Sequence, residues 1–191
     1  METEETLSSA WDKHVGAEFG AQAADQAVAT MTADAYVNLI PLMIGDRGRE
    51  AVRNFYATHF LPQLPPDIEI VPVSRTIGQS QVVDELIIRF THSIRMDWLL
   101  PGVAPTGKRV QVPLVAIIRF EGDKIVREHL YWDQASLLVQ LDLIDRALPV
   151  RGGEIAAQVL DPSQPINELI LRGGVNGSGT KPKTRARAAT A

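Results

Sequence analysis

Four side chains between residues 92 and 133 have the chemistry of acid and base catalysis. His129, Tyr131 and Asp133 alternate within the stretch DKIVREHLYWDQ, residues 123–134, and His92 lies in an earlier apolar run. An apolar pocket shifts the pKa of a carboxyl or an imidazole toward neutrality, where the group can move a proton. We therefore predict that Asp133 removes a proton next to a substrate carbonyl, and that His92 or Tyr131 donates a hydrogen bond to the enolate oxygen.

A predicted β-hairpin positions the first three of these side chains. The Gly-Asp pair at 122–123 is a turn signal between two alternating apolar runs, which predicts strands at 110–121 and 124–133. Pairing continued without interruption from this turn places Ala116 opposite His129. His129 and every second residue after it then share the aliphatic face of the first strand, which we interpret as the wall of a ligand cavity.

His92 is expected on the same face, in a long strand over residues 81–98. If the connection after this strand is symmetric, His92 faces Leu114 and shares a row with Tyr131. The two side chains would then be two strands apart, roughly 10 Å, which leaves room for a small organic molecule. A lone histidine in an apolar row is also often a satisfied core residue.

Other polar and aromatic side chains are candidates for binding the substrate. They are His129, Trp98, Asp97, Asn38, Trp11 and His14. By strand alternation Asp97 faces the cavity only if a β-bulge turns it, and a pair with Asp133 would then raise the pKa of one carboxyl. His14 lies four residues before Glu18 in a predicted helix, so a hydrogen bond within the helix is the simpler role of both.

We expect neither a metal ion nor a cofactor. His129 and Asp133 are four residues apart on a strand, roughly 13 Å, which is too far to share one metal ion. The sequence contains no GxxxxGK[ST] or GxGxxG phosphate-binding motif. The GxSxG nucleophile motif of the α/β-hydrolases is missing as well.

The composition predicts one globular domain at 1–172 and a disordered basic tail at 173–191. The formal charge is −4, and the tail holds four cations and no acid, so the body carries −8. This acidity argues against nucleic-acid binding. No apolar run approaches the roughly 20 residues of a membrane helix, the first residues are acidic, and cysteine is absent, so we expect a cytoplasmic protein without membrane contact.

The elements that must carry these residues follow from the periodicity. Helices are predicted at 2–19, 21–31, 49–60 and 134–148, with a shorter helix at 154–160. A short strand is predicted at 35–40, a turn at 45–49, and a further strand at 68–76 before the long strand and the hairpin.

Several stretches resemble the SnoaL-like polyketide cyclases, a branch of the nuclear transport factor 2-like superfamily. They are FYATHF at 55–60, THSIRMDWLLPG at 91–102, PTGKRVQVPLVAIIRF at 105–120 and REHLYWDQASLLVQ at 127–140. The resemblance implies an α+β fold, a cone-shaped barrel of a strongly curved antiparallel sheet closed by N-terminal helices. In the cyclases the acid/base aspartate lies near the end of the last strand in a Trp-Asp context, which corresponds here to Trp132-Asp133.

The superfamily contains isomerases, dehydratases, cyclases, epoxide hydrolases and non-catalytic binders. The expected function is therefore a cofactor-independent acid/base enzyme that acts on a small apolar carbonyl compound by cyclisation, isomerisation or dehydration. The alternative is a non-catalytic binding or dimerisation module for a small hydrophobic ligand. In the non-catalytic alternative Asp133 would only cap the helix that follows it. In either case we expect a homodimer through the outer sheet face, where Leu130 and Trp132 are predicted to point.

Overall fold

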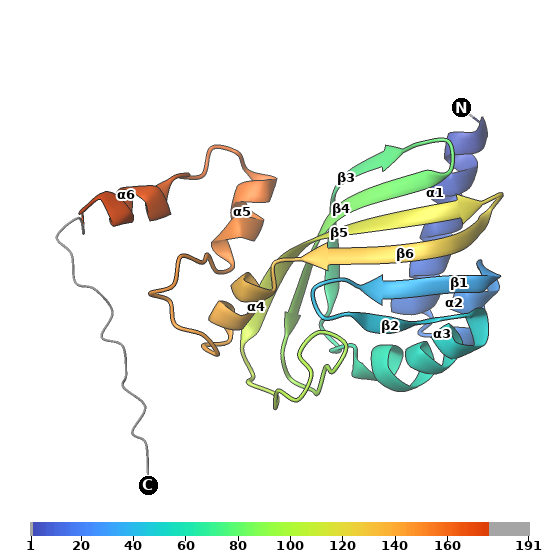
Figure 1. Ribbon diagram of the computed structural model, residues 1–191, viewed down its shortest axis with the longest axis horizontal. Helices are drawn as coiled ribbons and strands as arrows, with labels where there is room; N and C mark the ends of the chain where they lie inside the picture. The colour runs from blue at the N-terminus through green and yellow to red at the C-terminus, as the bar shows by residue number, and fades with distance from the viewer. Residues whose placement is uncertain (1, 176–191) are drawn as a thin grey trace, which may run out of the picture.

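The computed structural model describes residues 2–175 and contains one open, twisted sheet of six strands in the order β2-β1-β6-β5-β4-β3. Helix α1 crosses behind the sheet, and α2 and α3 lie beside its β1–β2 end (Figure 1). The C-terminal helices project from the opposite end of the molecule (Figure 1). The described helices are α1 (Glu2–Val15), α2 (Ala24–Ala29), α3 (Arg49–Phe55), α4 (Gln134–Gln140), α5 (Glu154–Leu160) and α6 (Glu168–Val175). The strands are β1 (Met31–Leu39), β2 (Ile44–Arg47), β3 (Glu69–Ile77), β4 (Gln81–Thr91), β5 (Arg109–Glu121) and β6 (Lys124–Trp132).

Two of the helices continue into short π-helical turns. Helix α1 is followed by η1 (Gly16–Gly20), and α3 is followed by η2 (Tyr56–Phe60) and a 3-10 turn, η3 (Leu61–Gln63). The helices predicted at 2–19 and 49–60 are therefore confirmed in extent, with a change of helical geometry in the last five residues of each. Such wider turns rotate the side chains that follow them and are frequent at functional sites.

The region after β1 contains a strand that the sequence did not predict. Residues 45–49 were expected to form only a turn, but β2 pairs antiparallel with β1, with Gly45 opposite Asn38. Gly45 has φ +145°, and a Cβ atom there would lie 2.0 Å from the carbonyl oxygen of Val37. The two strands can approach this closely only because position 45 is glycine.

The sheet is mixed rather than wholly antiparallel. Strand β1 runs parallel to β6, while the other neighbouring strands are antiparallel. Within residues 2–175 the edge strands β2 and β3 do not pair with each other, so the expected closure into a barrel is not found. The predicted α+β class with helices on one face of a bent sheet is confirmed.

A β-bulge in β6 reverses the predicted orientation of its second half. Near the turn Phe120 pairs with Ile125 as expected, but Arg119 pairs with Arg127, so Val126 is an extra residue. Beyond the bulge Leu130, and not His129, lies opposite Ala116. One inserted residue exchanges the two faces of a strand. Glu128, Leu130 and Trp132 therefore face the helices, and the prediction that they point outward is wrong.

Strand β4 is shorter than predicted. It ends at Thr91 instead of residue 98, and Leu86 is the residue that lies opposite Leu114. The amide of His92 donates to the carbonyl oxygen of Lys108 at 2.9 Å, at the base of the loop that leads to β5. The strand thus ends seven residues before the predicted position 98. The predicted row of His92, Leu114 and Tyr131 is therefore absent.

The core lies between the helices and the inner face of the sheet. Its buried members include Leu7, Val28, Val52, Phe55, Val82, Ile118, Ile125 and Leu137. Helices α4 and α5 pack on β5, and the predicted helix at 154–160 is confirmed. Helix α6 continues past the predicted domain end at residue 172, and the predicted disordered tail from residue 176 onward lies outside the described residues. No helix within residues 2–175 has the length and apolar character needed to span a membrane.

Candidate functional site

A cavity of about 250 Å³ lies between α1 and the inner face of the sheet. Its apolar wall comes from the end of α1, from η1 and η2 and from strands β3 to β6, and consists of Val15, Phe19, Phe60, Ile70, Pro72, Leu86, Ile88, Leu114, Ala116 and Leu130. Its polar lining comes from α1, η1 and the same strands, and consists of Trp11, Asp12, Glu18, Arg75, Asp84 and Glu128. This is an apolar pocket with a few convergent polar groups, the usual form of a small-molecule site.

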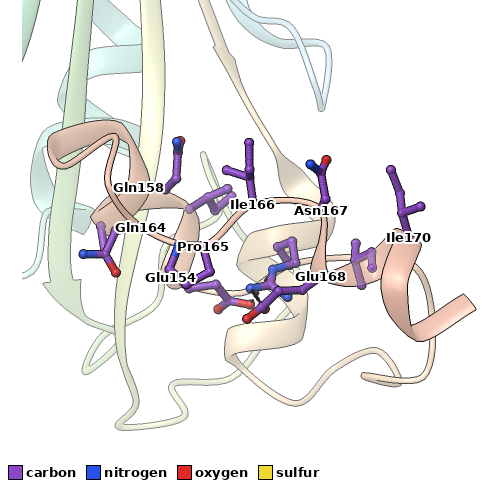
Figure 2. Close-up of a pocket in the computed structure, with 12 residues that line it drawn as sticks. Glu154, Gln158, Gln164, Pro165, Ile166, Asn167, Glu168 and Ile170 are labelled. Carbon is purple, nitrogen blue, oxygen red and sulfur yellow. Dashed lines mark ion pairs between the residues drawn. The ribbon is translucent and has the colours of Figure 1, made fainter.

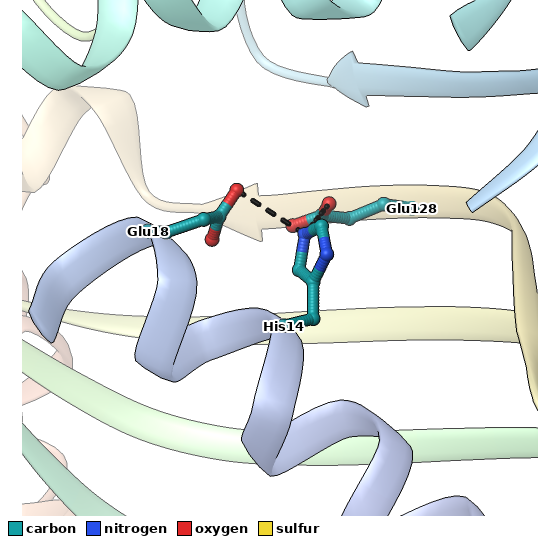
Figure 3. A group of neighbouring side chains, drawn as sticks. All are labelled: His14, Glu18 and Glu128. Carbon is teal, nitrogen blue, oxygen red and sulfur yellow. Dashed lines mark ion pairs between the residues drawn. The ribbon is translucent and has the colours of Figure 1, made fainter. Parts of the chain in front are cut away.

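Four buried polar side chains meet at the inner end of this cavity. The Nε2 atom of His14 lies 3.3 Å from Oε1 of Glu18 and 3.5 Å from Oε2 of Glu128. The hydroxyl of Tyr56 donates to the same Oε2 of Glu128 at 3.1 Å. Figure 3 shows the carboxylates of Glu18, from the helical segment, and Glu128, from β6, converging on the imidazole. We call His14, Glu18, Tyr56 and Glu128 the acid/base cluster.

A hydrogen-bond chain behind the cluster fixes the orientation of His14. The hydroxyl of Thr30 donates a hydrogen bond to the carbonyl oxygen of Ala27 at 2.6 Å. Its oxygen is therefore free to accept a hydrogen bond from Nδ1 of His14 at 2.7 Å. The ring also stacks on Trp11 with 5.5 Å between ring centres. Nδ1 is thereby held as a donor, and Nε2 is left to face the two carboxylates.

The two carboxylates keep the buried imidazole charged. Burial alone would lower the pKa of His14, but the charges and hydrogen bonds of Glu18 and Glu128 outweigh burial and raise this pKa to about 10. Burial, together with the negative charge of Glu18, raises the pKa of the Glu128 carboxyl. Burial also raises the pKa of Tyr56 well above its usual 10, which keeps the phenol a neutral donor.

The two carboxyl groups have different surroundings. Glu18 lies 3.3 Å from Nε2 of His14, while burial and the negative charge of Glu18 favour the protonated form of Glu128. Environments that make the pKa values of two neighbouring titratable groups differ create an acid and a base in one site. Because both Glu18 and Glu128 line the cavity, a bound molecule can reach the acid and the base together.

A second polar group closes the side of the cavity near β3 and β4. Arg75 donates to both carboxylate oxygens of Asp84, at 2.7 and 2.8 Å, and to Asp12 at 2.8 Å. The indole of Trp11 donates to Asp84 at 2.7 Å. This network ties α1 to the sheet and places Trp11 in the cavity wall, where it was predicted.

Asp133 lies outside the cavity. It is exposed, and its Oδ1 accepts a hydrogen bond from the amide of Ser136 at 3.1 Å, as the N-cap of α4. Tyr131 and His129 lie on the outer face of the sheet, where Tyr131 is 40% exposed and His129 packs against Tyr36 at 5.5 Å. The expected shared face of these residues with the aliphatic row is wrong, because the bulge turns them away.

Of the other predicted site residues, Trp11 lines the cavity and His14 contacts its lining residues Glu18 and Glu128, while the rest are separate from it. His92 is fully buried, its Nδ1 lies 3.2 Å from the hydroxyl oxygen of Thr106, and its Nε2 has no hydrogen-bond partner within residues 2–175. Burial lowers the pKa of His92, so it is a neutral core histidine. Asn38 lies on the outer face beside His129.

Asp97 and Trp98 belong to the loop after β4. The carboxylate of Asp97 accepts from Arg95 at 2.5 Å and from the amide of Gly102 at 3.3 Å, so the pair with Asp133 that a β-bulge would have allowed is not formed. Trp98 is buried, and its ring meets Phe60 edge to face at 5.0 Å. It supports the cavity wall from behind instead of lining it.

The polar residues of this candidate site that the sequence did not predict are Glu18, Glu128, Tyr56 and Asp84. The spacing of His14 and Glu18 contained the signal for one of them, because their predicted contact is confirmed. Asp84 alternates with Leu86 along β4, which indicates an inward carboxylate. Nothing local marks the bulge that turns Glu128 inward.

The acid/base cluster is also the group of described residues whose ligand atoms could hold a metal ion. One ligand atom each from His14, Glu18 and Glu128 lies within 4.8 Å of the others. The raised pKa of His14 means that a proton already occupies Nε2 at neutral pH. The absence of a metal cofactor stays a prediction.

A second hollow, of about 530 Å³, lies between α5 and α6 (Figure 2). The charged residues that line it are Arg151, Glu154 and Glu168. They pair with one another, since Arg151 contacts Glu154 at 3.0 Å and Glu168 at 2.7 Å. This hollow therefore offers no acid and base to a bound molecule, unlike the cavity of the acid/base cluster.

Comparison with known proteins agrees with the fold. A profile of the SnoaL-like domain matches residues 5–128. A solved protein from Jannaschia sp. CCS1, assigned as a SnoaL-like polyketide cyclase, is 19% identical with a TM-score of 0.62, and the alignment covers 76% of this chain and 97% of that one. AclR of Streptomyces galilaeus, assigned as a hydroxylase, is 17% identical with a TM-score of 0.59, and the alignment covers 90% and 91%. No curated protein matches the sequence. At these identities the solved structures establish the fold alone.

Proposed function

The chain belongs to the SnoaL-like domain family, and we propose that it is a cofactor-independent acid/base enzyme that acts on a small apolar carbonyl compound. The observation that carries the proposal is the acid/base cluster, in which Glu128, whose pKa is raised, and Glu18, beside the imidazole of His14, both open onto an apolar cavity. Such a pair is what enolisation of a carbonyl compound requires, because one group must protonate the oxygen while the other removes a carbon-bound proton.

Glu128 acts as the acid in this proposal. Tyr56 donates to Oε2 of Glu128, and we therefore place the proton of the carboxyl on Oε1. This proton passes to the carbonyl oxygen of the substrate as the oxygen gains electron density. The apolar wall strengthens the interaction, because the donor and the developing charge are screened by little water.

Glu18 acts as the base. Its carboxylate takes the proton from the carbon next to the carbonyl, and the electrons of the broken C–H bond form the C=C bond of the enol. Return of that proton to a different carbon, with return of the enol proton to Glu128, completes an isomerisation. Attack of the enol carbon on a second carbonyl would give cyclisation, and loss of a β-hydroxyl with a proton, as water, would give dehydration.

His14 positions the two carboxylates. Its charged ring is anchored through Nδ1 by Thr30 and contacts both Glu18 and Glu128 through Nε2. It stabilises the carboxylate of Glu18 in the resting protein and that of Glu128 after the proton has left. The imidazolium thus allows the negative charge to move between the two groups without a large change in energy.

The apolar lining also supports the second candidate, a protein that binds a small hydrophobic ligand without turnover. Binding would need the cavity but not the proton of Glu128, whereas catalysis needs both. The two candidates therefore differ in what replacement of the carboxyl groups by amides would do.

Solvent-proton exchange separates the candidates. Each of a set of small ketones, such as cyclohexanone, 3-cyclohexen-1-one and 1-indanone, is incubated with the protein in D2O, and NMR follows the loss of the protons next to the carbonyl. An enzyme accelerates this exchange for at least one ketone, and Glu18→Gln and Glu128→Gln each lower the rate by about 100-fold or more. Glu154→Gln, in the second hollow, is the matched control. Equal rates for the wild type and both cluster variants would leave only the binding function.

We also propose that the protein forms a homodimer through the outer face of the sheet. The half-exposed Tyr131 and its neighbours Tyr36 and His129 give this face an aromatic row. The partly buried Val115 and Ile117 extend it with aliphatic surface. Sedimentation analysis of the wild type and of Tyr131→Glu checks this, because a charge in the centre of an apolar interface should shift the sample toward monomer.

A further inference from the structure

One residue in the lining of the cavity is much smaller than the rest. Ala116, in the middle of β5, has a side chain of a single carbon atom, whereas the other lining residues are valine, proline, aspartate or larger. The other residues of β5 that face inward are all buried and all larger than alanine, and they are Val110, Val112, Leu114, Ile118 and Phe120. The inner face of the sheet therefore has a depression at Ala116.

The depression lies beside the acid of the acid/base cluster. Ala116 pairs with Asp84 of β4 on one side and with Leu130 of β6 on the other. Glu128 precedes Leu130 by two residues on the same face of β6, so it is the diagonal neighbour of Ala116. Diagonal neighbours on paired strands are roughly 7–8 Å apart, a distance that long side chains can span. A molecule seated over Ala116 is therefore within reach of the Glu128 carboxyl group.

The polar groups on the other side of the depression are already engaged. Asp84 accepts from the indole of Trp11 at 2.7 Å and from Arg75 at 2.7 and 2.8 Å. The Nη1 atom of Arg75 donates to Asp12 and to Ser8. A polar substituent of a ligand would find these groups occupied, and a buried polar group without a partner is costly. The depression therefore suits the apolar part of a ligand and leaves its carbonyl group to the acid/base cluster.

We propose that Ala116 is a specificity-determining residue of this site, where the apolar body of the substrate is seated while its carbonyl group meets Glu128. This inference rests on the proposed function, because it concerns the substrate of the same site. The short side chain of Ala116 leaves room at the point of the sheet from which the acid can be reached. A leucine side chain there would fill the depression and exclude larger substrates before smaller ones.

Ligand binding to Ala116→Leu tests the proposal without any turnover. Isothermal titration with 1-indanone and with cyclohexanone compares a larger and a smaller ketone. In the variant the affinity for 1-indanone should fall by about tenfold or more, while the affinity for cyclohexanone should change by less than about threefold. Ala116→Val, with a smaller added side chain, should give an intermediate loss. Equal losses for the two ketones, an unchanged affinity for 1-indanone, or no binding of 1-indanone to the wild type overturns the inference.

Stability distinguishes an open depression from a tightly packed position. A side chain that enters open space fills it, so the urea midpoint of Ala116→Leu should equal or exceed that of the wild type. Ala156 of α5 is the matched control, because it is fully buried and lies outside the cavity lining. Ala156→Leu should lower the midpoint by overpacking and leave the affinities for both ketones unchanged. A midpoint that falls as far in Ala116→Leu as in Ala156→Leu, or an unfolded Ala116→Leu, would show that position 116 is packed and would overturn the inference.

The two proposals fail in different ways. A selective loss of 1-indanone binding in Ala116→Leu, without any ketone exchange by the wild type, would refute the acid/base function and keep Ala116 as the residue that selects the ligand. Ketone exchange in which the wild type and Ala116→Leu treat 1-indanone and cyclohexanone alike would refute the role of Ala116 and leave the acid/base function intact.

Discussion

The buried ion cluster of His14, Glu18 and Glu128 should make the protein less stable as the pH rises through the alkaline range. The pKa of His14 is raised from 6.5 to about 10 in the folded protein. A raised folded-state pKa contributes stability that is fully present below the unfolded value and is lost as the pH rises through the folded value. The window for His14 is therefore from pH 6.5 to about pH 10.

The size of the effect follows from the same shift. A rise of the His14 pKa from 6.5 to about 10 corresponds to about 5 kcal/mol favouring the imidazolium in the fold, an order-of-magnitude value. The raised pKa of Glu128 acts in the same direction, from pH 4.5 upward. The surface carboxyls with lowered pKa values, such as Asp67, change their contribution only at acid pH.

Glu18→Gln is the informative perturbation, because it removes the carboxylate whose charge raises the His14 pKa most and keeps the shape of the side chain. Because burial continues to lower the His14 pKa once this charge is gone, the pKa in the variant should fall back toward 6.5, and the alkaline loss of stability should shrink with it. Urea unfolding of the wild type and the variant at several values between pH 6 and pH 10 measures the loss, and NMR titration of the His14 ring measures the pKa. A flat stability profile for the wild type over this range, or a His14 that titrates near 6.5, would refute the reasoning.

Three further predictions concern the cap, the β1–β2 contact and metal removal. Asp133→Ala removes the hydrogen bond by which Asp133 caps α4 at Ser136. In urea titrations it should lower the free energy of unfolding by about 1 kcal/mol, and it should leave ketone exchange unchanged. A loss of exchange comparable to that of Glu18→Gln would contradict this prediction. Gly45→Ala forces a Cβ atom against Val37 and should cost more than about 2 kcal/mol in the same assay, and an unchanged midpoint would count against the β1–β2 register. Treatment with EDTA, checked by elemental analysis, should leave ketone exchange unchanged, and a loss restored by a divalent ion would show that the acid/base cluster works with a metal.

Most of the helical half of the fold could be predicted from the sequence because its signals are local, although α2 and α4 are shorter than the helices predicted at 21–31 and 134–148. Regular spacing of apolar residues defined the helices at 2–19 and 49–60, and the same spacing placed His14 and Glu18 in contact. Trp11 was likewise placed correctly on the buried stripe of α1. A helix fixes the relation of residues three and four apart whatever it packs against.

The sheet half could not be predicted to the same depth, because a side chain's face depends on every residue between it and the turn. The hairpin and its turn at 122–123 were right, yet the extra residue Val126 exchanged the faces of everything after it. This single feature moved His129 and Tyr131 out of the site and brought Glu128 into it. The end of β4 at Thr91 had a similar effect on His92, because a loop, and not a longer strand, returns the chain to β5.

The most direct test of the account is the protonation state of Glu128. Infrared difference spectra of the wild type against Glu128→Gln, recorded well above the ordinary glutamate pKa of 4.5, detect the C=O stretch of a protonated carboxyl group. The account predicts such a band in the wild type and its absence in the variant, with Glu154→Gln retaining it. A wild type without the band would mean that Glu128 is ionised beside Glu18, and the acid required for the proposed chemistry would be missing.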